Sequence, residues 1–165
     1  MRELQQRKTT RLVGADYHTT GIFFLTICTK NKQCLLSHMV GTGVLDGPHI
    51  ELTHCGKIAD KYLNQLNDFY NDISIEDYVI MPNHIHLILR VNDLENGPSR
   101  MPAPTLQNST VSRFISTFKS FCNKECGENI WQYRSYDHII RNLQDYETHI
   151  KYIRKSAVLG SRSLI

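Results

Sequence analysis

The chain has 165 residues, 41% of them apolar, which is enough for the core of one domain and too short for several. Because no apolar run approaches the roughly 20 residues that span a bilayer, and no N-terminal segment resembles a signal peptide, we expect a cytoplasmic protein that does not contact membranes. The five cysteines form no C-x-x-C pair, so we expect reduced thiols rather than a disulfide framework.

The net charge of +3 is unevenly distributed along the chain. Residues 1–11 and 141–165 each carry +3, and the residues between them carry −3. Basic ends suit a polyanionic partner, because each neutralised phosphate releases counterions. Two solvated termini are an equally good interpretation of the charge alone.

The first half of the chain begins with a strand and continues into a helix. Residues 21–29 are rich in aromatic and β-branched side chains, which predicts a buried strand. Residues 35–53 hold several glycines and a proline between short apolar pieces, which indicates a small hairpin. Apolar residues at helical spacing predict a helix over residues 56–70.

Two adjacent strands come next, over residues 73–80 and 84–91, joined by a turn at residues 81–83. Residues 92–107 hold three of the five prolines and no clear periodicity, so we expect a loop.

The last third of the chain predicts helix, extended segment and helix. The first of these helices follows Ser109 or Thr110 as its cap. Residues 131–140 look extended, and a last helix spans about residues 143–157. Strand, helix, strand, strand, helix, strand is the order of a ferredoxin-like α+β domain, here with an extra C-terminal helix.

The segment MPNHIHLILR contains two histidines one residue apart. Side chains alternate across a strand, so His84, His86 and Ile88 share one face. The core face is expected to hold the alternating residues Ile85, Leu87 and Leu89. Both imidazoles then lie on the opposite face, not hidden from solvent, where one divalent transition ion could take a nitrogen from each. The alternative is a pair of histidines that only form hydrogen bonds.

The last helix offers a nucleophile for this pair. Its apolar stripe is Leu143, Tyr146, Ile150, Ile153 and Ala157, and a second stripe, about a quarter-turn away, is Asp145, His149, Tyr152 and Ser156. Tyr152 is therefore not an obvious core residue. Its phenol has an unperturbed pKa near 10 and becomes a nucleophile only after losing a proton, which a metal or cation nearby would favour. An amphipathic tyrosine at the edge of the core is the alternative. Tyr133, Tyr136 and Tyr146 are competing candidates, but Tyr146 lies in the apolar stripe.

Six blocks of this sequence together resemble the single-tyrosine HUH transposases, most closely their REP-associated tyrosine transposase branch. The most specific block is Asp77 to Ile88, DYVIMPNHIHLI. The others are FLTICTKN at 24–31, FKS at 118–120, IWQ at 130–132, YDHIIRN at 136–142 and the YI pair at 152–153.

This resemblance implies a ferredoxin-like, RRM-like HUH catalytic domain over residues 21–157, with a basic arm at 1–20 and a tail at 158–165. Such a domain cuts and rejoins single-stranded DNA, usually beside a hairpin. On this resemblance, His84 and His86 hold Mg²⁺ or Mn²⁺, and the ion polarises the scissile phosphate. Tyr152 attacks, leaving a 3′ hydroxyl and a 5′-phosphotyrosine. Both a monomer and a homodimer fit.

One position departs from the family. Where the family has an amide side chain as the third metal ligand, this chain has Ser156, whose hydroxyl is shorter and a poorer ligand. A catalytically weakened relative that binds single-stranded DNA is therefore an alternative function. A histidine-triad nucleotide hydrolase would need a third histidine at Ile88, and nothing in the spacing demands a zinc module with Cys55.

Further residues are candidates for supporting roles. His138 and His149 are possible neighbours of the site, although a structural role suits a lone histidine such as His138. The candidate DNA contacts are Arg7, Lys8, Arg11, Arg113 and Lys119. A solvated helix face explains Arg113 and Lys119 equally simply.

Overall fold

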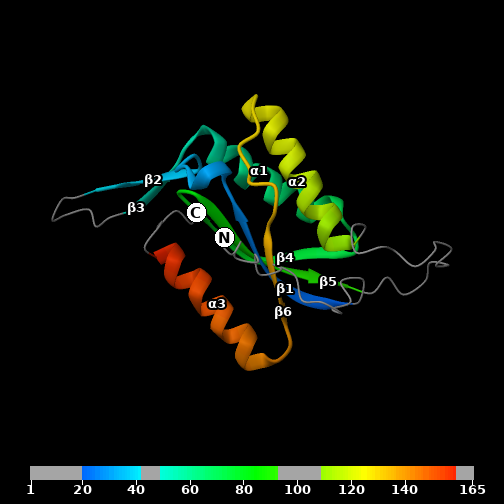
Figure 1. Cartoon of the computed structure of the whole chain (residues 1–165). Helices are drawn as coiled ribbons and strands as arrows, with labels where there is room; N and C mark the ends of the chain where they lie inside the picture. Colours follow the sequence, from blue (N-terminus) through cyan, green and yellow to red (C-terminus); the bar gives the residue numbers. More distant parts are fainter. Residues whose placement is uncertain (1–19, 42–48, 93–108, 159–165) are drawn as a thin grey trace, which may run out of the picture.

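The computed structural model describes residues 20–41, 49–92 and 109–158 (Figure 1). The strands are β1 Gly21–Cys28, β2 Ser37–Val40, β3 His49–Leu52, β4 Ile73–Met81, β5 His84–Val91 and β6 Tyr136–Ile140. The helices are the 3-10 turn η1 Lys30–Lys32 and the α-helices α1 His54–Phe69, α2 Thr110–Cys126 and α3 Leu143–Val158. No helix in these ranges is long and apolar enough to cross a membrane.

Four of the strands form one antiparallel sheet in the order β4-β5-β1-β6. The strands β2 and β3 pair separately, as the predicted hairpin between β1 and α1. Apart from this hairpin, the elements follow the predicted order β-α-β-β-α-β, and α3 follows at the end. The α+β class, the antiparallel sheet and the C-terminal helix are therefore confirmed.

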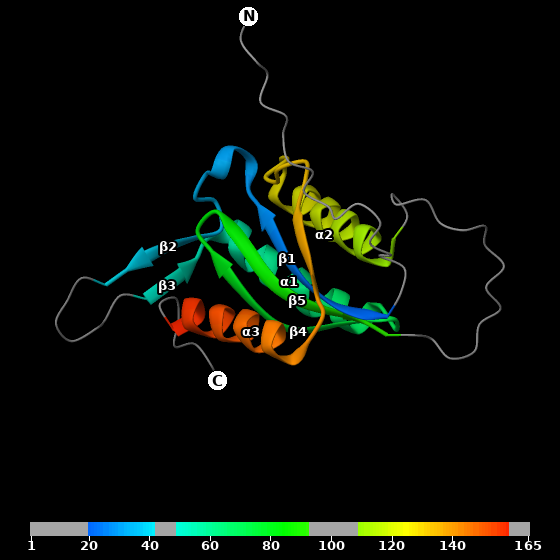
Figure 2. The same cartoon turned by 60° about the horizontal axis from the view of Figure 1, so that its bottom comes forward.

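The two faces of the sheet carry different helices (Figures 1 and 2). The helices α1 and α2 cover one face and bury the main core, which includes Ile85, Leu87 and Leu89 of β5. The single helix α3 covers the other face over a smaller core. That smaller core consists of Phe24, Val79, Ile88, Ile140, Ile150 and Ile153.

Local sequence signals explain where the helices begin. The Thr53 side chain accepts a hydrogen bond from the backbone N–H of Gly56 at 3.1 Å, so α1 begins two residues earlier than its apolar spacing predicts. Ser109 caps α2 in the same way, accepting from the Ser112 N–H at 3.1 Å, as predicted. Gly56 also packs against backbone, because a Cβ there would lie 1.9 Å from the Leu36 carbonyl oxygen.

Two expectations about the last third of the chain are wrong. The extended segment predicted for 131–140 is a strand only over β6, while Trp131 forms an isolated bridge with Thr29. The chain between them bends, and its carbonyl groups at 132 and 133 bind Lys119 instead of a neighbouring strand. Leu143, placed in the apolar stripe of α3, is 71% exposed. It lies in the first turn, whereas the buried contacts of α3 come from Ile150 and Ile153, further along the helix.

Candidate functional site

The two histidines lie on the face of β5 that α3 covers, as the alternation predicts. Their ring centroids are 4.5 Å apart, with the planes at 74°. The face is not open to solvent, however, because α3 packs over it: Ile88 is fully buried and His86 is only 8% exposed. The expectation of solvent-facing imidazoles is therefore wrong for His86, and the helix is the reason.

Each imidazole has one ring nitrogen engaged in a hydrogen bond. His84 Nδ1 lies 2.6 Å from Asn83 Oδ1, and His86 Nδ1 lies 2.9 Å from Thr26 Oγ1. An amide oxygen only accepts, so His84 donates through Nδ1 and its Nε2 carries the lone pair. The threonine hydroxyl can donate or accept, and when it accepts from Nδ1, Nε2 of His86 carries the lone pair as well. Neighbours of this kind orient metal-binding histidines.

The surroundings of both imidazoles favour the neutral form. Burial lowers the pKa of His84, and the charge of Lys32 lowers it further. Burial lowers the pKa of His86 to about 4, with smaller contributions from His84 and His149. Neutral imidazole is the form that binds metal ions, so at pH 7 the pair is in its ligand form.

Tyr152 lies beside this pair. Its ring centroid is 5.2 Å from that of His86 in an edge-on arrangement, and 6.4 Å from that of Phe24. The side chain is 50% exposed, as expected for a residue outside the apolar stripe. The fold thus brings a tyrosine from the last helix to the histidines of β5. Ser156 follows one helical turn later and is partly buried.

A second group of polar side chains joins β6 to α3. His138 Nε2 donates to Asp145 Oδ2 at 2.9 Å, and His149 Nδ1 lies 3.1 Å from Asp145 Oδ1. Burial favours the neutral acid, but the hydrogen bonds from His138 and the Arg141 backbone outweigh it and lower the pKa of Asp145. Ligand atoms of the three residues lie within 4.8 Å of one another, so this His/Asp/His group could hold a metal ion.

The two groups are connected through one aromatic ring. Phe24 stacks on His86 at 5.1 Å and contacts His149 at 4.4 Å between ring centroids. His138 and His149 are thus neighbours of the Tyr152 site in space. Sequence reasoning assigned no role to Asp145, Thr26 or Asn83. Asp145 was detectable from its helical spacing of four residues to His149, and Asn83 from its place beside His84.

The candidate DNA contacts on α2 are engaged in protein contacts. Arg113 pairs with Asp72 at 3.4 Å. The Lys119 ammonium donates to the backbone oxygens of Gln132 and Tyr133 at 2.8 and 3.3 Å. Helix α2 lies on the sheet face opposite α3. The N-terminal candidates Arg7, Lys8 and Arg11 lie outside the described residues.

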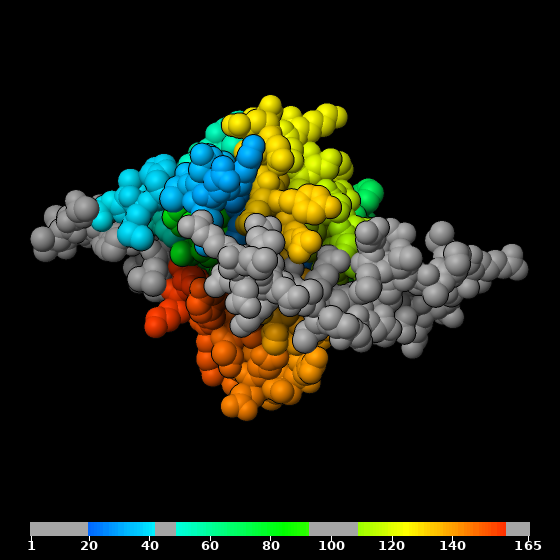
Figure 3. Space-filling view, in the orientation of Figure 1, coloured from blue at the N-terminus to red at the C-terminus, as the bar shows by residue number. Residues whose placement is uncertain are grey.

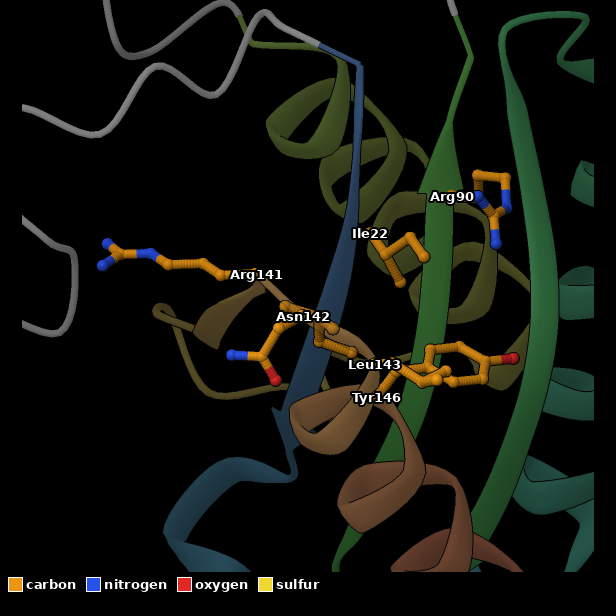
Figure 4. A pocket seen from close by; sticks show the side chains of 7 residues that line it. Ile22, Arg90, Arg141, Asn142, Leu143 and Tyr146 are labelled. Atoms are coloured by element: carbon orange, nitrogen blue, oxygen red, sulfur yellow. The ribbon is translucent and has the colours of Figure 1, made fainter.

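A zinc site with Cys55 is not formed, because Cys55 belongs to α1 and packs against the main core, on the far face of the sheet from His84 and His86. A hollow of about 410 Å³ does lie at the start of α3. Figure 4 shows Arg141 extending away from Tyr146 there. Arg90 at the rim is paired with Glu76. This hollow is separate from the histidine pair.

The sequence of this chain is similar to those of two known proteins. No family model matches the chain. An uncharacterized protein of Haemophilus influenzae is 27% identical over 169 residues, covering 94% of this chain and 91% of that protein. A REP-associated tyrosine transposase of Escherichia coli is 34% identical over 80 residues, which is 48% of this chain and 41% of the transposase.

The fold of this chain is also similar to that of a solved structure. A solved structure of a REP-associated tyrosine transposase bound to a REP hairpin matches with a TM-score of 0.60 and 22% identity. The match covers 90% of this chain and 73% of that one. By sequence and by fold, the chain is related to the REP-associated tyrosine transposases.

Proposed function

We propose that this protein is a metal-dependent DNA strand transferase, which cleaves and rejoins single-stranded DNA beside a hairpin. The observation that carries the proposal is the Tyr152 ring packed against His86, 5.2 Å between centroids, with His84 next to it. The ferredoxin-like order of the elements and the hairpin bound by the structural relative support it.

The residues present fit a divalent ion at His84 and His86. Both imidazoles are disposed to be neutral and have Nδ1 occupied by a neighbour, so Nε2 of each can face an ion. The proposed ion is Mg²⁺ or Mn²⁺. Ser156, one turn after Tyr152, is the proposed third ligand. When bound, the ion acts as a Lewis acid that polarises a phosphoryl oxygen.

The His138–Asp145–His149 group fits an ion less well. Each carboxylate oxygen of Asp145 already lies within 3.1 Å of a histidine nitrogen, so binding would have to break these contacts. Among the described residues no carboxylate pairs with His84 or His86, and the His86 ring lies 5.2 Å from that of Tyr152 between centroids. We therefore assign the metal to His84 and His86.

The proposed reaction takes place at the phenol of Tyr152, a side chain that is 50% exposed. Its phenol oxygen forms a bond to phosphorus while the bond to the 3′ oxygen breaks, and the proton lost by the phenol is balanced by one gained at the 3′ hydroxyl. The 5′ phosphate stays on the tyrosine, so attack by another 3′ hydroxyl rejoins the strand. With its pKa at about 4, His86 is a poor proton acceptor at pH 7, which suits a ligand rather than a base.

The test is incubation with a labelled single-stranded hairpin and Mn²⁺, followed by denaturing electrophoresis. A covalent protein–DNA adduct is expected with the wild type and not with Tyr152→Phe. The matched control is Tyr136→Phe, because Tyr136 is 51% exposed and lies on β6. This control should form the adduct. Failure of the wild type to form any adduct would refute the strand-transferase function.

The alternative function is binding of single-stranded DNA without cleavage. Ser156 favours it, because a hydroxyl is a weaker ligand than the amide that the related transposases are expected to use. Retention of the hairpin in a native gel, with no adduct under denaturing conditions, would support this alternative.

A further inference from the structure

A cavity of about 650 Å³ lies beyond the end of β1. Its lining combines lysines, amides and aromatic rings, and no carboxylate of the described residues takes part in it. The lining residues are Lys30, Asn31, Lys32, Asn129, Trp131, Gln132 and Tyr133. None of them has a role in the proposed chemistry. On the face seen in Figure 3, the η1 segment lies beside the chain that leads into β6.

The two walls of this cavity are joined by backbone hydrogen bonds. Lys30 N–H donates to the Ile130 carbonyl at 2.8 Å, and Gln132 N–H donates to the Cys28 carbonyl at 2.9 Å. The Lys119 ammonium, whose pKa burial lowers to about 8, holds the carbonyls of Gln132 and Tyr133 from behind. The cavity is therefore shaped before any ligand binds.

One wall has an unusual backbone. Asn31 and Lys32 have φ angles of 54° and 55°, in the left-handed region. Asparagine tolerates this conformation, but lysine adopts it rarely. Residues in such conformations persist where the surrounding structure enforces them, and they gather at ligand sites. Here the Asn83 amide donates to the Lys32 carbonyl at 3.4 Å and contributes to the enforcement.

The chemistry of the lining matches an unpaired nucleotide. Tyr133 is 95% exposed, so its ring is available as a stacking surface for a base. Lys30 and Lys32 are exposed and can neutralise phosphates. Proteins that bind single strands combine stacking aromatic rings with a basic groove in this way. A base can enter a cavity only when it is unstacked and unpaired, which excludes the interior of a duplex.

Asn83 connects the cavity to the proposed active site. Asn83 binds His84 through its amide oxygen at 2.6 Å and Lys32 through its amide nitrogen. We propose that this cavity binds one base and its adjoining phosphate, in the single strand flanking the cleavage point. The proposal rests on the proposed function for the identity of the partner.

The test measures binding separately from cleavage. All variants are made in a Tyr152→Phe background without metal, and anisotropy of a labelled hairpin with a single-stranded flank gives the affinity. Tyr133→Ala should weaken binding about 5-fold or more, since one stacked base is worth about 1–3 kcal/mol. Tyr133→Trp should restore it. Because Tyr133 is 95% exposed, its replacement leaves the core intact.

Two controls sharpen the result. Tyr136→Ala removes an aromatic ring that is 51% exposed but outside the cavity, and it should bind as the parent does. Lys30→Ala should lower the salt dependence of binding by about one phosphate contact. Lys57→Ala, at an exposed lysine of α1 on the other face of the sheet, should not change it. Equal affinities of the Tyr133→Ala and Tyr136→Ala proteins would overturn the proposal.

The fluorescence of Trp131 gives a second measurement of whether the cavity is occupied. Trp131 is the single tryptophan of the chain; it lines the cavity but is only 2% exposed and packs in the main core, so it reports a change in its surroundings rather than direct stacking on a base. Its fluorescence should change on addition of a short unpaired oligonucleotide and not on addition of a blunt duplex. Binding and fluorescence changes without an adduct in the cleavage assay would refute the proposed chemistry and leave the cavity assignment standing.

Discussion

The low pKa of His86 predicts a specific loss of stability in acid. The folded protein keeps this side chain neutral, because burial lowers its pKa from 6.5 to about 4. The unfolded chain exposes the same imidazole, which then binds a proton below its ordinary pKa. Between these two values the unfolded state holds more protons than the folded state. The contribution of neutral His86 to the free energy of unfolding is therefore fully present above pH 6.5. It is lost as the pH falls toward 4.

The magnitude follows from the two pKa values. Each pKa unit is worth about 1.4 kcal/mol, so the full difference is about 3 kcal/mol below pH 4 and about 2 kcal/mol at pH 5. His86 is only 8% exposed, so solvent screening reduces this little. His84, whose pKa is also lowered, adds a contribution of the same sign.

The measurement is urea unfolding at pH 8 and pH 5, with a chelator to keep the histidines free of metal. The wild type should lose about 2 kcal/mol more than His86→Gln between the two values. Comparing each protein with itself cancels any uniform effect of the substitution. His49→Gln, at an exposed histidine on β3, is the matched control and should keep the wild-type loss. An equal loss in the wild type and His86→Gln would refute the reasoning.

Three further changes have defined outcomes. Thr26→Val removes the hydroxyl at His86 Nδ1 and should weaken Mn²⁺ binding about 10- to 100-fold by titration calorimetry; Thr26→Ser should retain it, and equal losses would contradict an orienting role. Gly56→Ala places a Cβ 1.9 Å from the Leu36 carbonyl oxygen and should cost at least about 1–3 kcal/mol in urea unfolding; an unchanged midpoint would be inconsistent with this packing. Ser156→Asn should raise both Mn²⁺ affinity and adduct yield if position 156 is the third ligand, whereas Thr148→Asn on the same helix should change neither.

The features that sequence predicted correctly are local ones. Alternation along β5 placed Ile85, Leu87 and Leu89 in the main core and the histidines on the other face. The helical wheel of α3 separated the exposed Tyr152 from the buried Ile153. These predictions worked because a strand or helix fixes the directions of its own side chains, whatever it packs against.

The features that sequence could not predict depend on contacts between distant segments. The hydrogen bond between Thr26 and His86 requires the register of β1 against β5, which joins residues 60 positions apart. The burial of His86 requires α3 to dock on the sheet, which no pattern within β5 encodes. On the helical wheel of α2, Lys119 lies on the polar side, where a solvated lysine is expected. In the structure its ammonium instead donates hydrogen bonds to the backbone carbonyls of Gln132 and Tyr133.

Because Tyr152 and the histidines come from different layers, the docking of α3 sets the geometry of the proposed site. The apolar contact is small and centres on Phe24, Ile150 and Ile153. Polar contacts supplement it at both ends of the helix. Arg154 pairs with Asp77 of β4 at 3.3 Å, and Asp145 binds His138 of β6 at 2.9 Å.

The His138–Asp145–His149 group thus holds α3 against β6. Asp145 connects a strand histidine to a helix histidine, and His149 lies three residues before Tyr152, almost one turn of the helix. This connection fixes both the position and the rotation of the helical turn that carries Tyr152, the proposed nucleophile. The same contacts explain why three potential metal ligands gather beside the tyrosine without requiring a second ion there.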